Sequence, residues 1–325
     1  MNLTFLVTGS AGFIGSNLCD HLIRQGHKVI GLDNFSSGKQ ENIDRVMTSF
    51  TNNQYKFIKG DICNLTDIEE CFSYSIDVVV HLAAQGSVQK SFTNVAYNNR
   101  QNIDGFLNML KASGENRVAQ FIYASSCAIY GNTNDLPISE KHRPDPVSPY
   151  ASSKLMNDLL SHNLDHVYSH TSFTGLRFFN IFGPWQDPLG DYAAVVPKWN
   201  DLCISGRQPI IFGDGLATRD FCYVGNVCDL IESIGTKQSV KKANVYNVGS
   251  GISVTLNELY NGVNSALIKK GIQIKYDNPN YKPWRDGDIV HSLATIELAQ
   301  KELEFIPKIN LIEGLERILS EQYGL

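Results

Sequence analysis

The segment Thr8-Gly9-Ser10-Ala11-Gly12-Phe13-Ile14-Gly15 decides the fold. It lies where the apolar run Leu3–Thr8, a predicted strand, meets the amphipathic stretch Gly12–Gln25, a predicted helix. Glycines at a strand-to-helix turn let the backbone approach a phosphate, and the start of the helix offers free N–H groups and the positive end of its dipole. We therefore expect a dinucleotide to bind at Gly9, Gly12, Phe13, Ile14 and Gly15.

The same alternation of strand and helix continues to about residue 180. Helices are predicted over Ile103–Ala112 and Tyr150–Tyr168. Strands are predicted over Lys28–Asp33, Lys56–Lys59, Val78–Leu82, Gln120–Ser125 and Phe173–Phe179. Repeated β-α-β units with short connections indicate an α/β fold, a Rossmann-type doubly wound parallel sheet with helices on both faces.

The sequence pattern changes after Asn180, where the predicted loops become longer and richer in Gly, Pro and Trp. Helices are predicted over Ala193–Ser205, Asn226–Ile234, Leu256–Lys269, Thr295–Leu303 and Leu311–Gln322. We expect a Rossmann domain over residues 1–180 and a smaller α/β C-terminal lobe over residues 181–325, with some segments crossing between them.

The bulk composition excludes several classes of protein. The 325 residues are 42% apolar, which supports a sizeable core, and the net charge of -5 argues against a nucleic-acid partner. No stretch approaches the roughly 20 apolar residues that span a membrane, and the apolar run Leu3–Val7 is too short for a signal peptide. The seven scattered cysteines and the absence of a metal-spaced His cluster predict reduced thiols, no metal and a cytoplasmic location.

Two acidic residues lie at the ends of predicted strands, and each could either contact the cofactor or simply stabilise a turn. Asp33 ends the second strand, where a carboxylate accepts hydrogen bonds from a ribose 2′-OH and repels a 2′-phosphate, so NAD is expected rather than NADP. The alternative for Asp33 is a turn cap before Asn34. Asp61, in Gly60-Asp61-Ile62, either reaches the adenine amine or is a turn residue, and spacing does not decide between them.

Tyr150 and Lys154 form a Y-x-x-x-K pair at the start of a predicted helix. Four residues apart, they share one helix face, and a nearby ammonium favours the phenolate over the neutral phenol, whose ordinary pKa is near 10. Such pairs also occur by chance on solvated helices. This one lies just beyond Ser125 and Ser126, at the carboxyl end of a predicted strand, the edge at which open parallel sheets bind ligands.

Together these motifs resemble the extended short-chain dehydrogenase/reductases, specifically the nucleotide-sugar epimerases, over essentially the whole chain. The matching motifs are Thr8–Gly15, Leu32–Asn34, Gly60–Ile62, His81–Ala84, Ser125–Gly131, Ser148–Lys154, Arg177–Asn180, Arg219–Val224 and Arg285–Asp288. The resemblance is closest to members that epimerise UDP-N-acetylglucosamine. It implies NAD as the cofactor and a UDP-sugar as the substrate.

The resemblance also implies a role for each matching residue. Ser126 would hydrogen-bond the sugar 4-OH, Tyr150 would take its proton as the C4 hydride moves to NAD, and Lys154 would tune Tyr150 and hold the nicotinamide ribose. Further cofactor contacts would come from Asn34, Asp61, Ile62, Leu82, Ala83, Ala84, Asn102 and Phe179. Substrate contacts would come from Gly86, Ser87, Ser125, Asn180, Gln186, Ala194, Val195, Arg219, Arg285, Asp288 and Ser292.

The residues after Ser126 bear on the reaction. Relatives that dehydrate or decarboxylate their sugar place an acidic residue there, whereas this chain has Cys127, Ala128 and Ile129. That difference favours return of the hydride to the opposite face of a 4-keto sugar, which is 4-epimerisation. A dehydratase or decarboxylase is the second interpretation, and a non-catalytic NAD-binding protein, which would usually lack the Tyr/Lys pair, is the third.

Two positions bear on the identity of the sugar. A small residue at Ser292 leaves room for an acetamido group, which favours UDP-GlcNAc and UDP-GalNAc, with their uronic acids and the plain hexoses UDP-glucose and UDP-galactose as alternatives. Gly86 replaces a lysine common in UDP-glucose epimerases, and fits a subgroup in which the backbone of Gly86 and Ser87 lies against the sugar. Apolar Leu159, Leu160 and Val167 also predict a homodimer through a four-helix seam.

Overall fold

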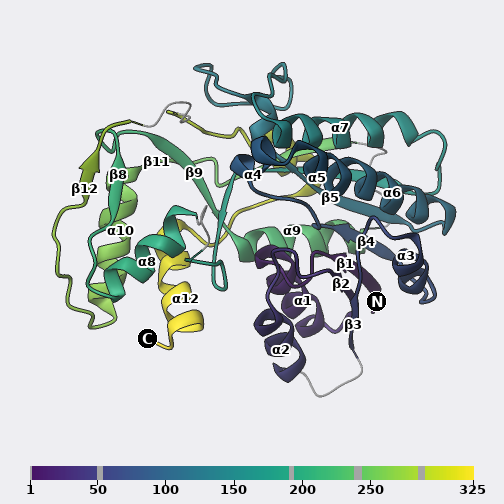
Figure 1. Ribbon diagram of the computed structural model, residues 1–325, viewed down its shortest axis with the longest axis horizontal. Helices are drawn as coiled ribbons and strands as arrows, with labels where there is room; N and C mark the ends of the chain where they lie inside the picture. The colour runs from purple at the N-terminus through teal and green to yellow at the C-terminus, as the bar shows by residue number, and fades with distance from the viewer. Residues whose placement is uncertain (1, 50–53, 190–193, 238–243, 285–289) are drawn as a thin grey trace. The chain divides into compact units, whose positions relative to one another are not determined.

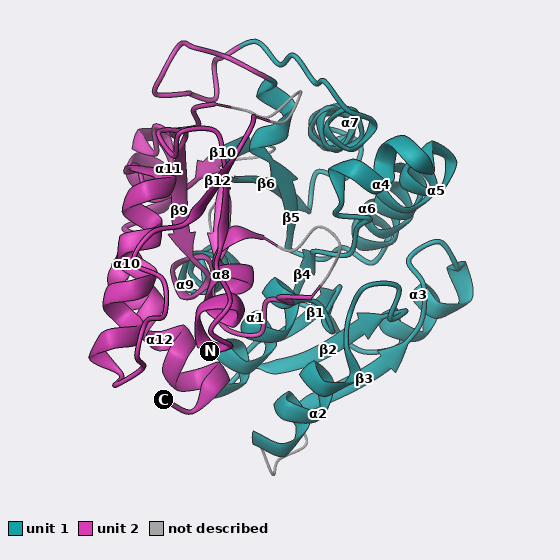
Figure 2. Cartoon of the chain, turned by 60° about the vertical axis from the view of Figure 1, so that its left-hand side comes forward, with its two compact units in different colours: residues 1–131, 143–178, 228–246 teal, residues 132–142, 179–227, 247–325 magenta. Residues whose placement is uncertain are grey.

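The computed structural model describes residues 2–49, 54–189, 194–237, 244–284 and 290–325. The chain forms two compact units (Figure 2). Unit 1 comprises residues 1–131, 143–178 and 228–246, and unit 2 comprises residues 132–142, 179–227 and 247–325.

Unit 1 is built on a parallel sheet whose strand order is β10-β6-β5-β4-β1-β2-β3; Figure 1 labels β1 to β5, and Figure 2 also labels β6 and β10. Its strands are β1 (Thr4–Thr8), β2 (Lys28–Asp33), β3 (Tyr55–Lys59), β4 (Val78–His81), β5 (Gln120–Ser126), β6 (Ser172–Phe178) and β10 (Asn244–Val248), the last of which runs on into unit 2. This order, with a crossover from β3 back to β4 beside β1, confirms the predicted Rossmann-type doubly wound fold.

Helices cover both faces of this sheet (Figure 2). They are α1 (Phe13–Arg24), α2 (Gln40–Ser49), α3 (Leu65–Phe72), α4 (Val88–Thr93), α5 (Val95–Asn99), α6 (Gly105–Glu115), α7 (Pro149–Leu164) and the second half of α9 (Val224–Thr236). Between α6, α7 and the sheet lies an aromatic core in which Phe106 packs edge-on against Phe121 and Tyr123, all three fully buried or nearly so. Burial of such rings is a large hydrophobic contribution to stability.

The carboxyl ends of the central strands meet at one edge of the sheet. Thr8 of β1 pairs with His81 of β4, and His81 pairs with Tyr123 of β5, so Ser126 ends its strand at the same edge. Beside this edge the helical stretch before α6 widens into a π-helical turn, η1 (Arg100–Asp104). Such turns are rare and are often found at functional sites.

Unit 2 contains two small sheets, one of order β11-β9-β7 and one that pairs β12 with β8. Its elements are β7 (Asn180–Phe182), α8 (Val195–Ile204), β8 (Ile210–Phe212), β9 (Thr218–Tyr223), β11 (Ser253–Thr255), α10 (Leu256–Lys269), β12 (Asn280–Lys282), α11 (Glu297–Leu303) and α12 (Leu311–Tyr323). Helix α10 begins with a capping box, in which Thr255 and Glu258 each bind the other's backbone N–H.

The predicted bounds are confirmed for β2 and α10 and lie within a few residues for the other predicted elements. Helices α2 to α5, strand β10 and the short strands of unit 2 were not predicted. The three-residue strands β8 and β12 pair across about 70 residues of sequence, so no local pattern marks them. Within the described ranges, no helix is long and apolar enough to cross a membrane, and no group of His, Cys, Asp or Glu could hold a metal ion.

Candidate active site and cofactor pocket

The glycine turn between β1 and α1 is a tight cradle of backbone. Gly9 has φ of +72°, a conformation open to glycine, and a Cβ there would lie 2.8 Å from the nitrogen of Ala83. A Cβ on Gly15 would collide with the carbonyl oxygen of Gly9, and the N–H of Gly12 donates to that same oxygen at 3.0 Å. The turn brings bare backbone and the start of α1 together, which fits a pyrophosphate.

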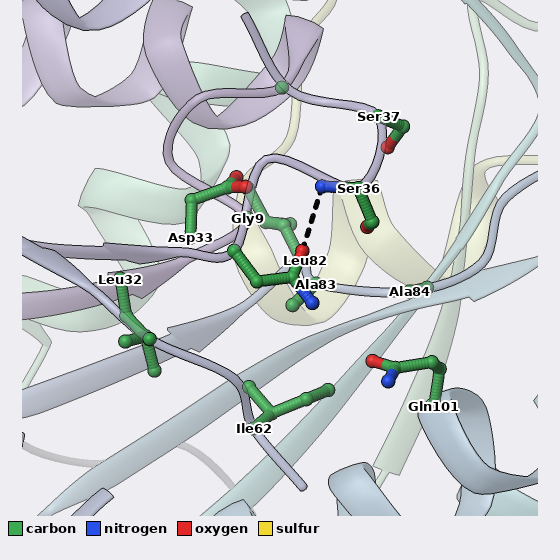
Figure 3. A pocket seen from close by; sticks show the side chains of 13 residues that line it. Gly9, Leu32, Asp33, Ser36, Ser37, Ile62, Leu82, Ala83, Ala84 and Gln101 are labelled. Atoms are coloured by element: carbon green, nitrogen blue, oxygen red, sulfur yellow. Dashed lines mark hydrogen bonds between the residues drawn. The ribbon is translucent and has the colours of Figure 1, made fainter. Parts of the chain in front are cut away.

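A pocket opens beside this turn, and Figure 3 shows Gly9, Asp33, Ile62 and Gln101 around it. Its lining comes from the ends of the strands and from η1: Gly9, Gly12, Leu32, Asp33, Asn34, Ser36, Ser37, Gly60, Ile62, Leu82, Ala83, Ala84 and Gln101. Eight of these lining residues are among the predicted cofactor contacts. Phe13, Ile14, Gly15 and Asp61 lie next to the pocket in the chain but do not line it.

The Asp33 carboxylate is held in place by the backbone. Its Oδ2 accepts from the N–H of Ala11 at 2.9 Å and its Oδ1 from the N–H of Phe35 at 2.8 Å. Burial raises the pKa of this carboxyl, although the backbone N–H groups oppose the rise. None of the pocket-lining residues is Lys or Arg, the cations that would receive a 2′-phosphate. The pocket therefore fits NAD, as predicted.

Asp61 is a turn residue in this structure. Its carboxylate accepts from the N–H of Cys63 at 2.8 Å and from the Asn34 amide at 3.0 Å. These hydrogen bonds hold the pKa of Asp61 below its ordinary value, even though partial burial opposes them. A contact with adenine stays a prediction.

Asn102 is buried, and both its side-chain oxygen and its side-chain nitrogen make hydrogen bonds within the protein. Its Oδ1 accepts from the N–H of Gln85 at 2.7 Å, and its Nδ2 donates to the Ser153 hydroxyl at 3.0 Å and to two further oxygens. Ser153 precedes Lys154, so Asn102 joins the loop after β4 to the helix that carries Tyr150 and Lys154. Its predicted role beside the cofactor is not tested by these contacts.

Ser126, Tyr150 and Lys154 lie together at the end of β5 and the start of α7. Ser148 caps α7, and Pro149 occupies its first position, which fixes where Tyr150 begins its first turn. The Ser126 side chain lies close enough to the Tyr150 hydroxyl to influence its ionisation. The Lys154 Nζ donates to the carbonyl oxygen of Ala124 at 2.8 Å and lies 5.9 Å from the centre of the Tyr150 ring.

The ionisation of these groups is dominated by burial. Burial raises the pKa of Tyr150 to about 12, and the neighbouring Ser126 side chain opposes that rise. Burial also lowers the pKa of Lys154 to about 8, while the negative charge of Asp158 opposes the fall. The sequence predicts that Lys154 lowers the pKa of Tyr150, whereas in the structure the loss of water around the buried phenol is the largest influence and raises that pKa.

Two buried groups lie close to Lys154. Burial and the Lys154 charge lower the pKa of His81 to about 3, and its Nδ1 hydrogen-bonds the Thr8 hydroxyl at 3.0 Å, so His81 is neutral at physiological pH. Asp158, one turn beyond Lys154, pairs with the buried Arg177 at 3.0 Å and accepts from the Tyr123 hydroxyl at 3.2 Å. Burial raises the pKa of Asp158, and the Arg177 charge and the nearby side chain of Ser125, a predicted substrate contact, oppose that rise.

The loop at Gly86 and Ser87 is open on one side and braced on the other. A Cβ on Gly86 would meet no atom within 4 Å. The N–H of Ser87 donates to the Gln85 side-chain oxygen at 2.6 Å, and its carbonyl accepts from the Gln85 amide at 2.9 Å. The backbone of Ser87 is thus engaged within the loop, and the space beside Gly86 is free for a ligand.

Unit 2 contains a cavity of about 520 Å³. Five predicted contacts line it: Phe179, Asn180, Ala194, Val195 and Arg219. Lys198, Trp199, Phe212 and Trp284 also line it and were not predicted. Aromatic and aliphatic walls with two cations suit a flat base joined to a diphosphate, since guanidinium and ammonium groups bind phosphate oxygens.

The remaining substrate candidates lie elsewhere in unit 2. Ser292 is 6% exposed, and its N–H donates to the carbonyl oxygen of Thr218 at 3.1 Å. Gln186 has a buried side-chain oxygen without a hydrogen-bond partner among the described residues. Arg285 and Asp288 lie outside the described residues.

Several lining residues were not predicted from the sequence, for physical reasons. Gln101 enters the cofactor pocket from the π-helical turn, which has no sequence signature of its own. Ser36 and Ser37 form a polar loop directly after Asp33, and this position in the sequence could have predicted them as pocket residues. In unit 2, Phe212 and Trp284 come from or beside the long-range pair β8 and β12.

Comparison with known proteins agrees with this geometry. Residues 5–249 match the NAD dependent epimerase/dehydratase family. A putative UDP-glucose 4-epimerase of Methanocaldococcus jannaschii is 34% identical over 318 residues, which is 97% of each chain. A UDP-glucose 4-epimerase of Thermotoga maritima, solved with UDP-glucose, is 35% identical with a TM-score of 0.87 over 98% of each chain. A UDP-N-acetylglucosamine 4-epimerase of Methanobrevibacter ruminantium, solved with UDP-N-acetylmuramic acid, is 33% identical with a TM-score of 0.87 over 99% of each chain.

The parallel sheet, the glycine turn and the Ser126, Tyr150 and Lys154 cluster define a dinucleotide-dependent enzyme, and the chain belongs to the NAD dependent epimerase/dehydratase family. Within that family it is an NAD-dependent nucleotide-sugar 4-epimerase.

Proposed function

We propose that the enzyme interconverts the C4 epimers of UDP-N-acetylhexosamines, UDP-GlcNAc and UDP-GalNAc, through a transient 4-keto sugar. The observation that carries the choice of sugar is Ser292, a small and buried residue at the position where the resemblance places the sugar pocket. Replacing a bulky aromatic by serine frees the volume that an acetamido group needs.

The roles of the chain in this reaction follow from its chemistry. Bound NAD would accept the C4 hydride and return it, and its oxidised nicotinamide ring carries a positive charge. Tyr150 takes the proton of the sugar 4-OH, and Ser126 donates a hydrogen bond to the oxygen as negative charge develops there. Lys154, with its pKa near 8, is largely protonated at neutral pH and supplies the nearby positive charge that a phenolate requires.

The cavity in unit 2 is proposed to hold the UDP group. Arg219 and Lys198 would bind the diphosphate, with Asn180 as a further donor, and the aromatic walls would receive the uracil. Arg285 and Asp288 are proposed to add diphosphate and ribose contacts, as the resemblance implies.

The competing substrates are UDP-glucose and UDP-galactose, which the names of two similar proteins favour, and the uronic acids of the acetylated sugars. The test supplies the enzyme with UDP-GlcNAc, UDP-GalNAc, UDP-glucose and UDP-galactose and separates the products. We expect the largest kcat/KM for the acetylated pair. A larger kcat/KM for the plain hexoses would refute the proposed sugar, and a keto or pentose product would refute epimerisation.

Ser292→Tyr tests the residue on which the sugar choice rests. The added ring fills the space at a buried position, so kcat/KM for UDP-GlcNAc should fall about tenfold or more relative to that for UDP-glucose. Ser265→Ala, at an exposed serine of α10 in unit 2, is the control and should leave this ratio within about twofold. An unchanged ratio in Ser292→Tyr would show that residue 292 does not contact the acetamido group.

We also propose that the enzyme is a homodimer that pairs through α6 and α7. Leu107, Met156 and Leu159 are exposed on these neighbouring helices, whereas Leu160 packs against the core of unit 1 and takes no part. Met156→Glu with Leu159→Glu should give a monomer by light scattering, and Leu65→Glu, an exposed leucine on α3, should not. A monomeric wild-type protein would refute the proposal.

A further inference from the structure

Asp220 is a buried carboxylate directly after Arg219 on β9, and its side chain has no exposed surface. Its Oδ1 accepts from the N–H and the hydroxyl of Ser250, at 2.6 and 2.7 Å. Its Oδ2 accepts from the N–H of Gly251 at 3.1 Å and from the N–H of Ala294 at 3.2 Å. One side chain therefore joins β9 to two segments that lie far from it in the sequence.

The second of these segments carries Ser292. On one side it is tied to β9, because the N–H of Thr218 donates to Val290 at 2.9 Å and the N–H of Ser292 donates back to Thr218 at 3.1 Å. On the other side it is tied to Ile138, whose N–H donates to Leu293 at 2.8 Å. Ser292 thus sits in a short strand-like stretch with a partner on either side.

Asp220 differs from these backbone partners because it supplies a charge. A carboxylate that accepts N–H groups inside a protein makes stronger hydrogen bonds than a neutral acceptor, and a buried charge is stable only where such donors surround it. The bond to Ala294 is two residues beyond Ser292, so a shift of Ala294 would move Ser292 as well. Arg219 is affected too, since its Nη1 donates to the carbonyls of Thr218 and Val290 at 2.8 and 3.2 Å.

We propose that Asp220 is a positioning residue for sugar specificity, which holds Ser292 in place through the N–H of Ala294. The Asp220 carboxylate hydrogen-bonds Ser250, Gly251 and Ala294, and not Ser126 or Tyr150, the residues that we assign to proton transfer. Its removal should therefore loosen the recognition of the sugar more than it slows the chemistry. This inference rests on the proposed function, because it assumes that Ser292 borders the sugar.

The test compares Asp220→Asn with Ser250→Ala. The asparagine keeps the shape but removes the charge and replaces one acceptor by an NH₂ group, so at least one N–H donor loses its hydrogen bond. Ser250→Ala removes a single hydroxyl bond to Asp220 and leaves Ala294 alone. We expect Asp220→Asn to raise KM and to lower the kcat/KM ratio of UDP-GlcNAc to UDP-glucose about fivefold, with kcat changed less, and Ser250→Ala to change the ratio less than about twofold.

A double-mutant cycle separates positioning from a general loss of stability. If Asp220 acts through residue 292, then Ser292→Tyr and Asp220→Asn should change the selectivity ratio non-additively. Additive effects, or a folded Asp220→Asn enzyme with the wild-type ratio, would overturn the inference. Should the wild type prefer plain hexoses, the proposed sugar fails, yet the cycle still reports whether residues 220 and 292 are coupled.

A measurement on the wild-type enzyme covers the case in which Asp220→Asn does not fold. Amide hydrogen exchange of the peptide that contains Ala294 is followed with UDP and with UDP-GlcNAc. We expect UDP-GlcNAc to slow the exchange more than UDP alone, because the sugar would close against the Ser292 segment. Equal protection by the two ligands would overturn the inference.

Discussion

The glycine turn of unit 1 and the Ser292 segment of unit 2 are held in place in different ways. Gly9, Gly12 and Gly15 form a turn between consecutive elements, closed by the hydrogen bond from Gly12 to Gly9, and Leu32 of β2 and Ala83 just after β4 pack against it. The Ser292 segment depends on Thr218 and Ile138, which lie about 70 and 150 residues away in the sequence. The first site is centred on one local turn, and the second is assembled wholly from distant parts of the chain.

This difference separates the chemistry from the choice of substrate. The cofactor turn and the Ser126, Tyr150 and Lys154 cluster belong to unit 1, where a buried parallel sheet fixes them. Ser292 and Arg219 belong to unit 2, where short strands and one buried carboxylate fix them. Changes in the first region should alter the rate for every sugar alike, and changes in the second should alter which sugar is preferred.

Tyr150→Phe should show the largest effect. The phenylalanine keeps the ring but cannot take a proton, so kcat should fall about a thousandfold for every UDP-sugar that the wild type accepts, with NAD retained. Turnover is measured by product separation and NAD by its release on denaturation. Tyr74→Phe, at an exposed tyrosine of unit 1, should keep wild-type turnover. More than a tenth of the wild-type kcat in Tyr150→Phe would remove Tyr150 as the base.

The same local-versus-distant contrast explains what the sequence could predict. The β1–α1 turn, Asp33 at the end of β2 and the Tyr150/Lys154 pair were all predicted, because each depends on neighbours in the chain. Gln101 and Lys198 were not, since a π-helical turn and a cavity wall assembled from separate elements decide their positions. The raised pKa of Tyr150 was also missed, because burial depends on the whole fold.

Asp158→Asn tests how much the buried ion pair between Asp158 and Arg177, one helical turn beyond Lys154, contributes to stability. It removes the carboxylate charge from the buried ion pair with Arg177, so the free energy of unfolding of unit 1 should fall by about 3 kcal/mol. Urea unfolding measures this change. Asp20→Asn is the matched control, since it breaks an ion pair with Arg24, which is 61% exposed, and should cost less than about 0.5 kcal/mol. Equal effects in the two variants would contradict the assigned importance of the buried pair.

Because His81 is buried, we expect the stability of the protein to depend on pH in the acid range. The pKa of His81 is about 3 in the folded protein against an ordinary value of 6.5, so unfolding takes up a proton between these pH values. The free energy of unfolding should therefore fall as the pH is lowered from 6.5, by at most about 1.4 kcal/mol per pH unit from this group. His81→Asn should flatten that slope, and His166→Asn, at an exposed histidine, should not. Identical slopes in wild type and His81→Asn would show that His81 is not held neutral.

Lys198→Ala should give the smallest effect. It tests whether nucleotide binding and sugar selection in unit 2 depend on different residues. Lys198 is an exposed residue of α8 that lines the cavity proposed for UDP, whereas Ser292 does not line it. Loss of one solvated cation should weaken UDP binding about threefold at low salt and less at high salt, since ions screen exposed charges. Because the diphosphate is common to all substrates, KM should rise equally for each sugar, with selectivity unchanged. Calorimetry with UDP measures the change, and Lys301→Ala on α11 is the control. A changed preference among sugars would mean that the nucleotide and sugar contacts of unit 2 are not separable.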